Sequence, residues 1–154
     1  MQLAEIEICR FTEDLWQIVL GLPVRRRIGL AMPDGACVTG SVAIRGGWRG
    51  AVVLECAEPV ARHAASVMFG MDAGKIEPPE SSDCVRELTN IIAGNLKSVF
   101  PGPSSLGVPS VELGPARENP GSRVVARLAF ETPNGLIFVS LLEQGSEDED
   151  RRRR

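Results

Sequence analysis

The sequence predicts an α+β fold, in which helices pack on a six-stranded, largely antiparallel sheet. Short β-leaning runs are separated by turn-forming residues, and Asn134-Gly135 between two such runs is a strong hairpin signal. Other segments carry apolar residues at helical spacing. The predicted order is helix, three strands, two helices, three strands. The second half therefore weakly repeats the first, and we expect a pseudo-symmetric fold.

Cap and turn signals give the bounds of each predicted element. Thr12 is expected to cap a first helix that ends near Gly21, and Pro59 opens a second helix that stops before Gly70. The third helix is expected over residues 82–100. The predicted strands are residues 24–32, 36–45, 49–57, 107–113, 122–131 and 135–143. The first three strands are expected to form an antiparallel meander, with tight turns at "PDG" and "GG".

Length and composition indicate one domain. The chain has 154 residues, of which 44% are hydrophobic and 24% are charged, and this balance suits a compact soluble domain. We expect the domain to cover residues 1–144 and the charged tail 145–154 to be disordered. The apolar runs are too short to cross a bilayer, and the N-terminus lacks the features of a signal peptide, so a cytoplasmic location is expected.

Metal and nucleic-acid sites are not expected. The four cysteines form no CxxC pair, and His63 has no neighbour at metal-ligand spacing. The cysteines are expected to behave as reduced, small hydrophobic residues. The arginine run 25–27 lacks interleaved aromatic residues, and four acidic residues precede the arginines of the tail.

The third helix separates into two faces. Val85, Leu88, Ile92, Leu96 and Val99 are expected on the apolar face. The opposite face carries residues at spacings of four, three, four and three, namely Asp83, Glu87, Asn90, Gly94 and Lys97. We call these five residues the outer stripe.

Spacing alone fits a simple solvated helix face. Gly94 counts against this interpretation, because a glycine inside a helix costs about 1 kcal/mol relative to alanine. Its position next to Asn90 would allow another backbone to approach closely. The outer stripe is therefore a candidate contact surface for a partner.

The segment "DCVRELTNIIAGNLKSVF" resembles the signature helix of the CheC/CheX chemotaxis phosphatases, whose pattern is Asp or Ser, three residues, Glu, two residues, Asn. Asp83, Glu87 and Asn90 match this pattern. The family pattern also carries a later proline, and here Pro109 comes early and Pro115 late. CheC proteins repeat the Glu/Asn pair on an earlier helix, whereas here Trp16 stands three residues after Glu13, so a second site is not expected.

The resemblance implies hydrolysis of the aspartyl phosphate of a CheY-type response regulator. Asn90 would orient the attacking water, since an amide has no useful pKa near neutrality but can donate and accept hydrogen bonds. Glu87 would pair with a lysine of the regulator. Asp83 would have a peripheral role near the helix N-terminus, and Gly94 would provide clearance. The chain itself would bind no cofactor, because Mg²⁺ would be supplied by the regulator.

The resemblance also implies a homodimer that pairs through sheet edges. The alternative function is a catalytically inactive CheX-like adaptor or dimerisation module that binds a response regulator. Retention of both Glu87 and Asn90 favours the phosphatase. A scaffold role like that of the related flagellar switch proteins is the weakest interpretation, because those proteins need flanking segments.

Overall fold

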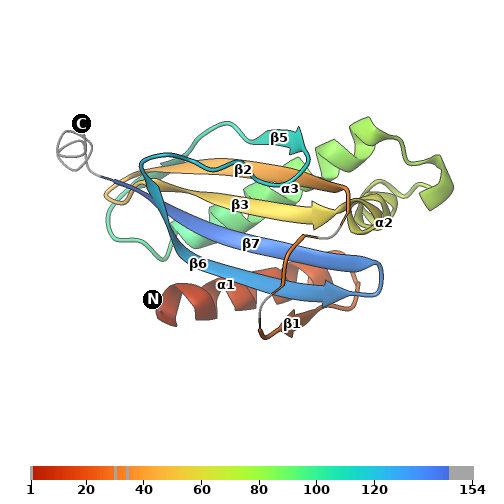
Figure 1. Ribbon diagram of the computed structural model, residues 1–154, viewed down its shortest axis with the longest axis horizontal. Coiled ribbons are helices and arrows are strands. Elements are labelled where there is room, and N and C mark those ends of the chain that lie inside the picture. The colour runs from red at the N-terminus through yellow and green to blue at the C-terminus, as the bar shows by residue number, and fades with distance from the viewer. Residues whose placement is uncertain (1, 30, 34, 146–154) are drawn as a thin grey trace.

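A seven-stranded antiparallel sheet forms the framework, and its helices lie together behind it (Figure 1). The computed structural model describes residues 2–29, 31–33 and 35–145. The strands are β1 (Arg25–Arg27), β2 (Cys37–Gly46), β3 (Gly50–Ala57), β4 (Ser104–Leu106), β5 (Ser110–Leu113), β6 (Ser122–Thr132) and β7 (Gly135–Gln144). The helices are α1 (Gln2–Asp14), α2 (Glu58–Phe69) and α3 (Pro78–Lys97), with a π-helical turn (Leu15–Val19) directly after α1 and a 3-10 turn (Ala73–Lys75) before α3.

The sheet confirms the predicted α+β class and its antiparallel pairing. The strand order is β1-β6-β7-β3-β2-β4, and β5 also pairs with β2. The hairpins β2–β3 and β6–β7 lie side by side in the centre, where β3 pairs with β7. Within the described ranges, no helix is long and apolar enough to cross a membrane. The predicted tail lies outside the described residues from position 146 onward.

The first helix begins ten residues before the predicted start. The prediction that Thr12 caps it is wrong, because Thr12 lies inside α1 and is fully buried. The apolar stripe already begins at Ala4 and continues through Ile8 to Leu15, and all three side chains are buried against the core. Burial of this longer stripe outweighs the local capping signal of a threonine followed by acids.

The predicted meander of the first three strands is confirmed for β2 and β3, which form an antiparallel hairpin, but it is wrong for β1. β1 pairs with β6 at one edge of the sheet, whereas β2 lies toward the other edge. β1 and β2 are therefore not neighbouring strands joined by a tight turn. Arg25 and Arg27 of β1 both form ion pairs with Glu131 of β6, and these contacts favour the observed neighbour.

The predicted strand 107–113 is shorter in the structure, where β5 begins only at Ser110, and the unpredicted strand β4 directly before it accounts for the seventh strand. β4 and β5 both pair with β2, but their registers differ by one residue: Leu106 lies opposite Ile44, and Ser110 lies opposite Ser41. Pro109 stands in the interruption. A proline has no N–H for a sheet ladder, so it is tolerated at an edge or a bulge.

The core fills the space between the sheet and the helices. Inward side chains of the central strands, such as Val42, Leu54 and Val139, are fully buried there. The opposite face of the sheet also buries polar groups. Glu55 is only 3% exposed, and its carboxylate accepts hydrogen bonds from Arg127 at 2.6 Å and from the backbone N–H of Ala116 at 3.2 Å. These bonds hold the link 114–121 onto β3, because buried polar groups require partners.

Candidate functional site

Helix α3 is the longest helix of the described chain and packs on β2 and β3 while contacting α1 and α2. It starts at Pro78, four residues before the predicted start, because Pro78 and Pro79 occupy its first turn, where a missing N–H costs no hydrogen bond. Its last helical residue is Lys97. Val85, Leu88, Ile92 and Leu96 are at most 1% exposed, which confirms four of the five residues predicted for the apolar face. The fifth, Val99, lies beyond the end of the helix and is half-buried.

A close contact fixes how α3 sits on the sheet. Thr89 is fully buried on the sheet-facing side, and its hydroxyl donates a hydrogen bond to the Val85 carbonyl at 2.6 Å. Gly40 of β2 lies directly beneath, and a Cβ there would overlap the Thr89 hydroxyl. The missing side chain at Gly40 therefore lets the helix approach the strand. Since Asn90 follows Thr89 in the chain, this contact also sets the orientation of Asn90.

The outer stripe lies on the side of α3 that faces away from the core. Asp83 and Glu87 are exposed, and Asn90 and Lys97 are half-buried. Asp83 forms an ion pair with Arg86, and it lies inside the helix rather than at its N-terminus, where Glu77 is the cap residue. The expectation that Asp83 acts near the helix N-terminus is therefore wrong. The structure brings all five predicted site residues onto one surface.

The reactive groups of the stripe are free within the part of the chain that the structure describes. There, no hydrogen bond or ion pair engages the side chains of Glu87, Asn90 or Lys97. Glu87 and Asn90 are three residues apart, so they are neighbours on the helix surface. An acid and an amide are thus presented together to whatever contacts this surface.

Gly94 has no internal reason to be a glycine. A Cβ at this position would meet Leu106 Cδ1 of β4 at 3.9 Å, which is ordinary van der Waals contact. An alanine would therefore fit the fold without strain. The contact also shows that the stripe runs beside the β4–β5 edge of the sheet, since Leu106 comes from that edge.

The comparison that decides the family is the match to the family described as Chemotaxis phosphatase CheX. It covers residues 38–130, which is more than half of the chain and includes all five stripe residues. The chain belongs to the CheX family. The family assignment made from "DCVRELTNIIAGNLKSVF" is thereby confirmed. A search of curated proteins gave no match.

Solved structures of CheX proteins share the fold. The chemotaxis protein CheX of Vibrio vulnificus superposes with a TM-score of 0.74 at 18% identity, covering 91% of this chain and 96% of that one. CheX of Desulfovibrio desulfuricans gives 0.72 at 20% identity, with 91% and 99% covered. CheX in the CheX-CheY-BeF3-Mg²⁺ complex of Borrelia burgdorferi gives 0.68 at 17% identity, with 93% and 98% covered.

The side chains of the outer stripe have groups suited to forming hydrogen bonds and ion pairs, not to covalent chemistry. Asn90 can donate and accept hydrogen bonds but cannot take up a proton near neutral pH. Glu87 can accept charge-assisted hydrogen bonds from a cation. Behind them, Cys84 is fully buried. Its burial, and to a lesser extent the negative charge of Glu87 nearby, raises the pKa of its thiol to about 12. The Cys84 thiol is therefore neutral and unsuited to act as a nucleophile.

No metal cluster lies near the stripe or elsewhere in residues 2–29, 31–33 and 35–145. A group of three histidine, cysteine, aspartate or glutamate side chains able to hold a metal ion is absent from those residues. Cys37, Cys56 and Cys84 are buried free thiols, in line with their prediction as small hydrophobic residues, and Cys9 is half-buried.

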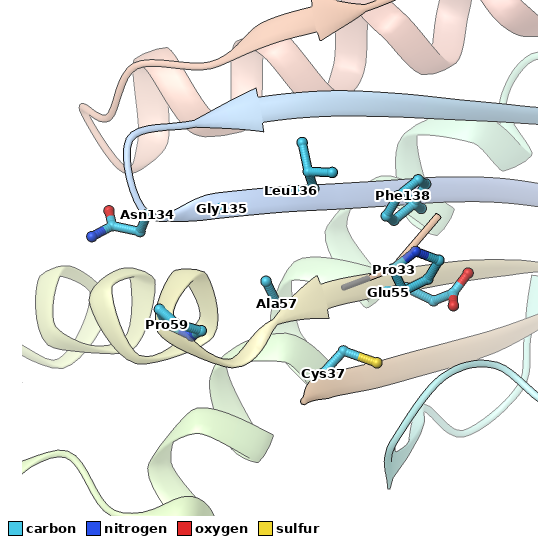
Figure 2. Close-up of a pocket in the computed structure, with 9 residues that line it drawn as sticks. All are labelled: Pro33, Cys37, Glu55, Ala57, Pro59, Asn134, Gly135, Leu136 and Phe138. Atoms are coloured by element: carbon cyan, nitrogen blue, oxygen red, sulfur yellow. The ribbon is translucent and has the colours of Figure 1, made fainter. Parts of the chain in front are cut away.

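A cavity on the opposite face of the sheet is another location to consider for a site. It has a volume of about 210 Å³ and is lined in part by Cys37, Glu55 and Phe138 (Figure 2). The thiol of Cys37 has a raised pKa, chiefly because it is buried. Both oxygens of the Glu55 carboxylate already accept hydrogen bonds. The cavity thus offers no free acid or activated nucleophile, whereas the stripe presents its polar groups unpaired.

Two structural features of the site were not predicted from the sequence. Gly40 and Thr89 are far apart in the chain, and a glycine in a β-strand is the only sequence signal that a close approach occurs there. Val108 was predicted inside a strand, whereas it lies between β4 and β5, where Pro109 after it is a signal of a bulge.

Proposed function

We propose that this chain hydrolyses the aspartyl phosphate of a CheY-type response regulator. The observation that carries the proposal is the pairing of Glu87 and Asn90, adjacent and unengaged, on a helix face that points away from the core. The family is one of chemotaxis phosphatases, and a structure of the same fold contains a CheX protein with CheY, BeF3 and Mg²⁺.

Asn90 is assigned the placement of the attacking water. Phosphoryl transfer requires in-line placement and charge stabilisation more than covalent help from the protein. An amide suits this role, because it can hold a water by donating one hydrogen bond and accepting another. A half-buried position on a rigid helix restricts the amide, and this restriction favours accurate placement.

Glu87 is assigned to docking. Its exposed carboxylate would pair with a lysine of the regulator and fix the depth at which Asn90 enters the phosphorylation site.

Mg²⁺ is proposed to arrive bound to the regulator. Titration calorimetry of the isolated chain with MgCl₂ should then give no tight site, and a micromolar site would contradict this assignment.

The test is hydrolysis of a panel of phosphorylated receiver domains by the purified chain. Wild type should accelerate phosphate loss from a cognate regulator. Asn90→Ala should lose on the order of 100-fold or more in turnover and still bind the beryllofluoride-activated regulator, because only water placement is removed. Glu87→Ala should also weaken binding, because a charge-assisted contact is lost.

The same variants separate the phosphatase from the adaptor. An adaptor would bind the activated regulator with no acceleration by wild type and no effect of Asn90→Ala on turnover. Asp83→Ala is the matched control on the same helix, since Asp83 is exposed and its partner is Arg86 of this chain. It should retain most of the wild-type rate.

We also propose a homodimer and a cytoplasmic reaction with the regulator. Among the described residues, β1 pairs only with Ala129–Glu131 of β6, which leaves the outer edge of Ser122–Leu128 without a strand. An unpaired edge of this length can add a strand from a second copy.

A further inference from the structure

The edge of the sheet beside the stripe is interrupted by a bulge. Leu106 lies opposite Ile44 and Ser110 lies opposite Ser41, so three residues stand between them where the facing strand β2 has two. This count is that of a β-bulge, which bends a strand and directs a side chain away from the ladder. Val108 lies in this bulge and is 90% exposed, the highest value among the exposed large hydrophobic residues of the described chain.

Apolar residues of this edge lie on the same side of the sheet as α3. Leu106, Val111 and Leu113 lie opposite Ile44, Gly40 and Val38, whose sheet face is the one covered by α3. Leu106 and Val111 pack against the core, whereas Leu113 is 75% exposed. Leu106 also contacts the position of Gly94. The sheet edge that contacts the outer stripe at Gly94 thus carries two exposed apolar residues, Leu113 on the α3 side and Val108 in the bulge.

The backbone that presents these residues is held in place. The N–H of Gly107, directly before Val108, donates to the Ala43 carbonyl at 2.8 Å, and the N–H of Gly114, directly after Leu113, donates to the Cys37 carbonyl at 2.8 Å. The exposed side chains are therefore carried by an ordered edge that needs little additional ordering to make a contact. Covering an exposed valine or leucine side chain removes apolar surface from water and so favours binding.

A second copy of the chain is a poor occupant for this edge. Pro109 has no N–H to donate to an added strand, and the bulge breaks the ladder between β4 and β5. The other sheet edge, along Ser122–Leu128 of β6, has no proline despite a register shift between Val124 and Ala126, and within the described part of the chain it offers a longer run without a pairing strand. A macromolecule that lies across the stripe would instead cover Val108 and Leu113 together with Glu87 and Asn90.

We infer that Val108 and Leu113 form an apolar border of the docking surface and contact an apolar patch of the response regulator next to its phosphorylation site. This inference rests on the proposed function, because it takes the regulator as the partner. The contact works in docking only, since neither side chain can act on the phosphoryl group. The apolar border would increase the affinity for the regulator. Glu87 would add a charged contact, and Asn90 would place the attacking water.

The test measures both steady-state hydrolysis and binding of the beryllofluoride-activated regulator by the full chain. Val108→Asp should raise the KM and the dissociation constant about tenfold, the change expected from losing one buried valine, with kcat within about twofold of wild type. Leu113→Asp should act in the same direction. Ile28→Asp is the matched control, because Ile28 is 89% exposed but follows β1 at the opposite end of the strand order.

The outcomes separate this inference from the function on which it rests. If Asn90→Ala loses turnover while Val108→Asp binds and turns over like wild type, the apolar border is wrong and the proposed function stands. If Asn90→Ala has wild-type turnover but Val108→Asp still weakens binding, the phosphatase mechanism is wrong and the border stands. Equal weakening by Ile28→Asp would overturn the border. Circular dichroism should show unchanged folding for all of these surface variants.

Discussion

At the scale of single residues, the absence of a side chain at Gly94 is as informative as the presence of one at Asn90. A glycine within a helix weakens it, and the nearest atom to a Cβ at position 94 would be 3.9 Å away. Neither helix propensity nor internal packing therefore accounts for this residue. Close approach of a partner's backbone would account for it, because Gly94 lies one turn beyond Asn90 on the outer stripe.

Gly94→Ala should consequently separate stability from activity. The substitution should raise the free energy of unfolding by about 1 kcal/mol, because alanine has the higher helix propensity and the added methyl group meets no overlap. It should also raise the KM for the phosphorylated regulator, since the methyl group occupies the clearance. Urea denaturation and initial-rate hydrolysis measure the two effects. A more stable variant with an unchanged KM would show that the glycine serves no partner.

Residue patterns predicted the stripe well because helical spacing is a local property. The separation of Leu88 and Ile92 from Glu87 and Asn90 depends only on 3.6 residues per turn, and the burial of α3 follows it. The role of Asp83 was predicted less well, because it depended on where the helix begins. Pro78 and Pro79 extended α3 by one turn and placed Asp83 in its interior.

At the scale of elements, the contact between α3 and β2 connects the stripe to the fold. Gly40 and Thr89 meet where the helix crosses the strand, and a methyl group on Gly40 would also come within 3.2 Å of Val85 Cγ1. Interiors are close-packed, so such an overlap shifts the helix or strains side chains. A shift of α3 would move Asn90 relative to the docked regulator.

Gly40→Ala should therefore lower both stability and turnover. We expect a loss of about 1–3 kcal/mol in the free energy of unfolding and a fall in kcat that exceeds the change in KM. Adding Thr89→Ala removes the overlapping hydroxyl and should recover part of both losses. A double-mutant cycle on unfolding and on kcat measures this coupling. Strictly additive effects would show that the Gly40–Thr89 contact does not set the helix position.

The elements that were predicted poorly are those decided by distant contacts. The hairpin at Asn134-Gly135 is local and is present, with Gly135 at φ +146°. The neighbour of β1 is not local, because the turn signal at 33–35 shows only that the chain bends there. The extent of α1 likewise depended on burial of Ala4 and Ile8 against the core, which no cap residue indicates.

At the scale of the whole molecule, the two edges of the sheet offer different surfaces. The β4–β5 edge carries Pro109 and a bulge beside the stripe, and both disfavour strand addition. The β6 edge also has a register shift, between Val124 and Ala126, but it contains no proline. Among the described residues no strand pairs with its outer side along Ser122–Leu128, and Val124 there is 61% exposed. Helix α1 contacts β6 and exposes Leu3 and Ile6. A dimer through β6 would thus leave both stripes accessible to regulators.

Dimerisation through β6 predicts a specific effect of a charge at Val124. Val124→Glu should convert the dimer into a monomer, as measured by sedimentation velocity at micromolar concentration. In a two-fold symmetric dimer through this edge, the two glutamates would be buried near the symmetry axis and repel each other. Val124→Thr, which keeps the β-branched shape, should stay dimeric. Turnover per chain should change little in the monomer, since the outer stripe and the β4–β5 edge lie at the other end of the strand order. A wild-type chain that is already monomeric, or a Val124→Glu variant that stays dimeric, would rule out this edge as the interface.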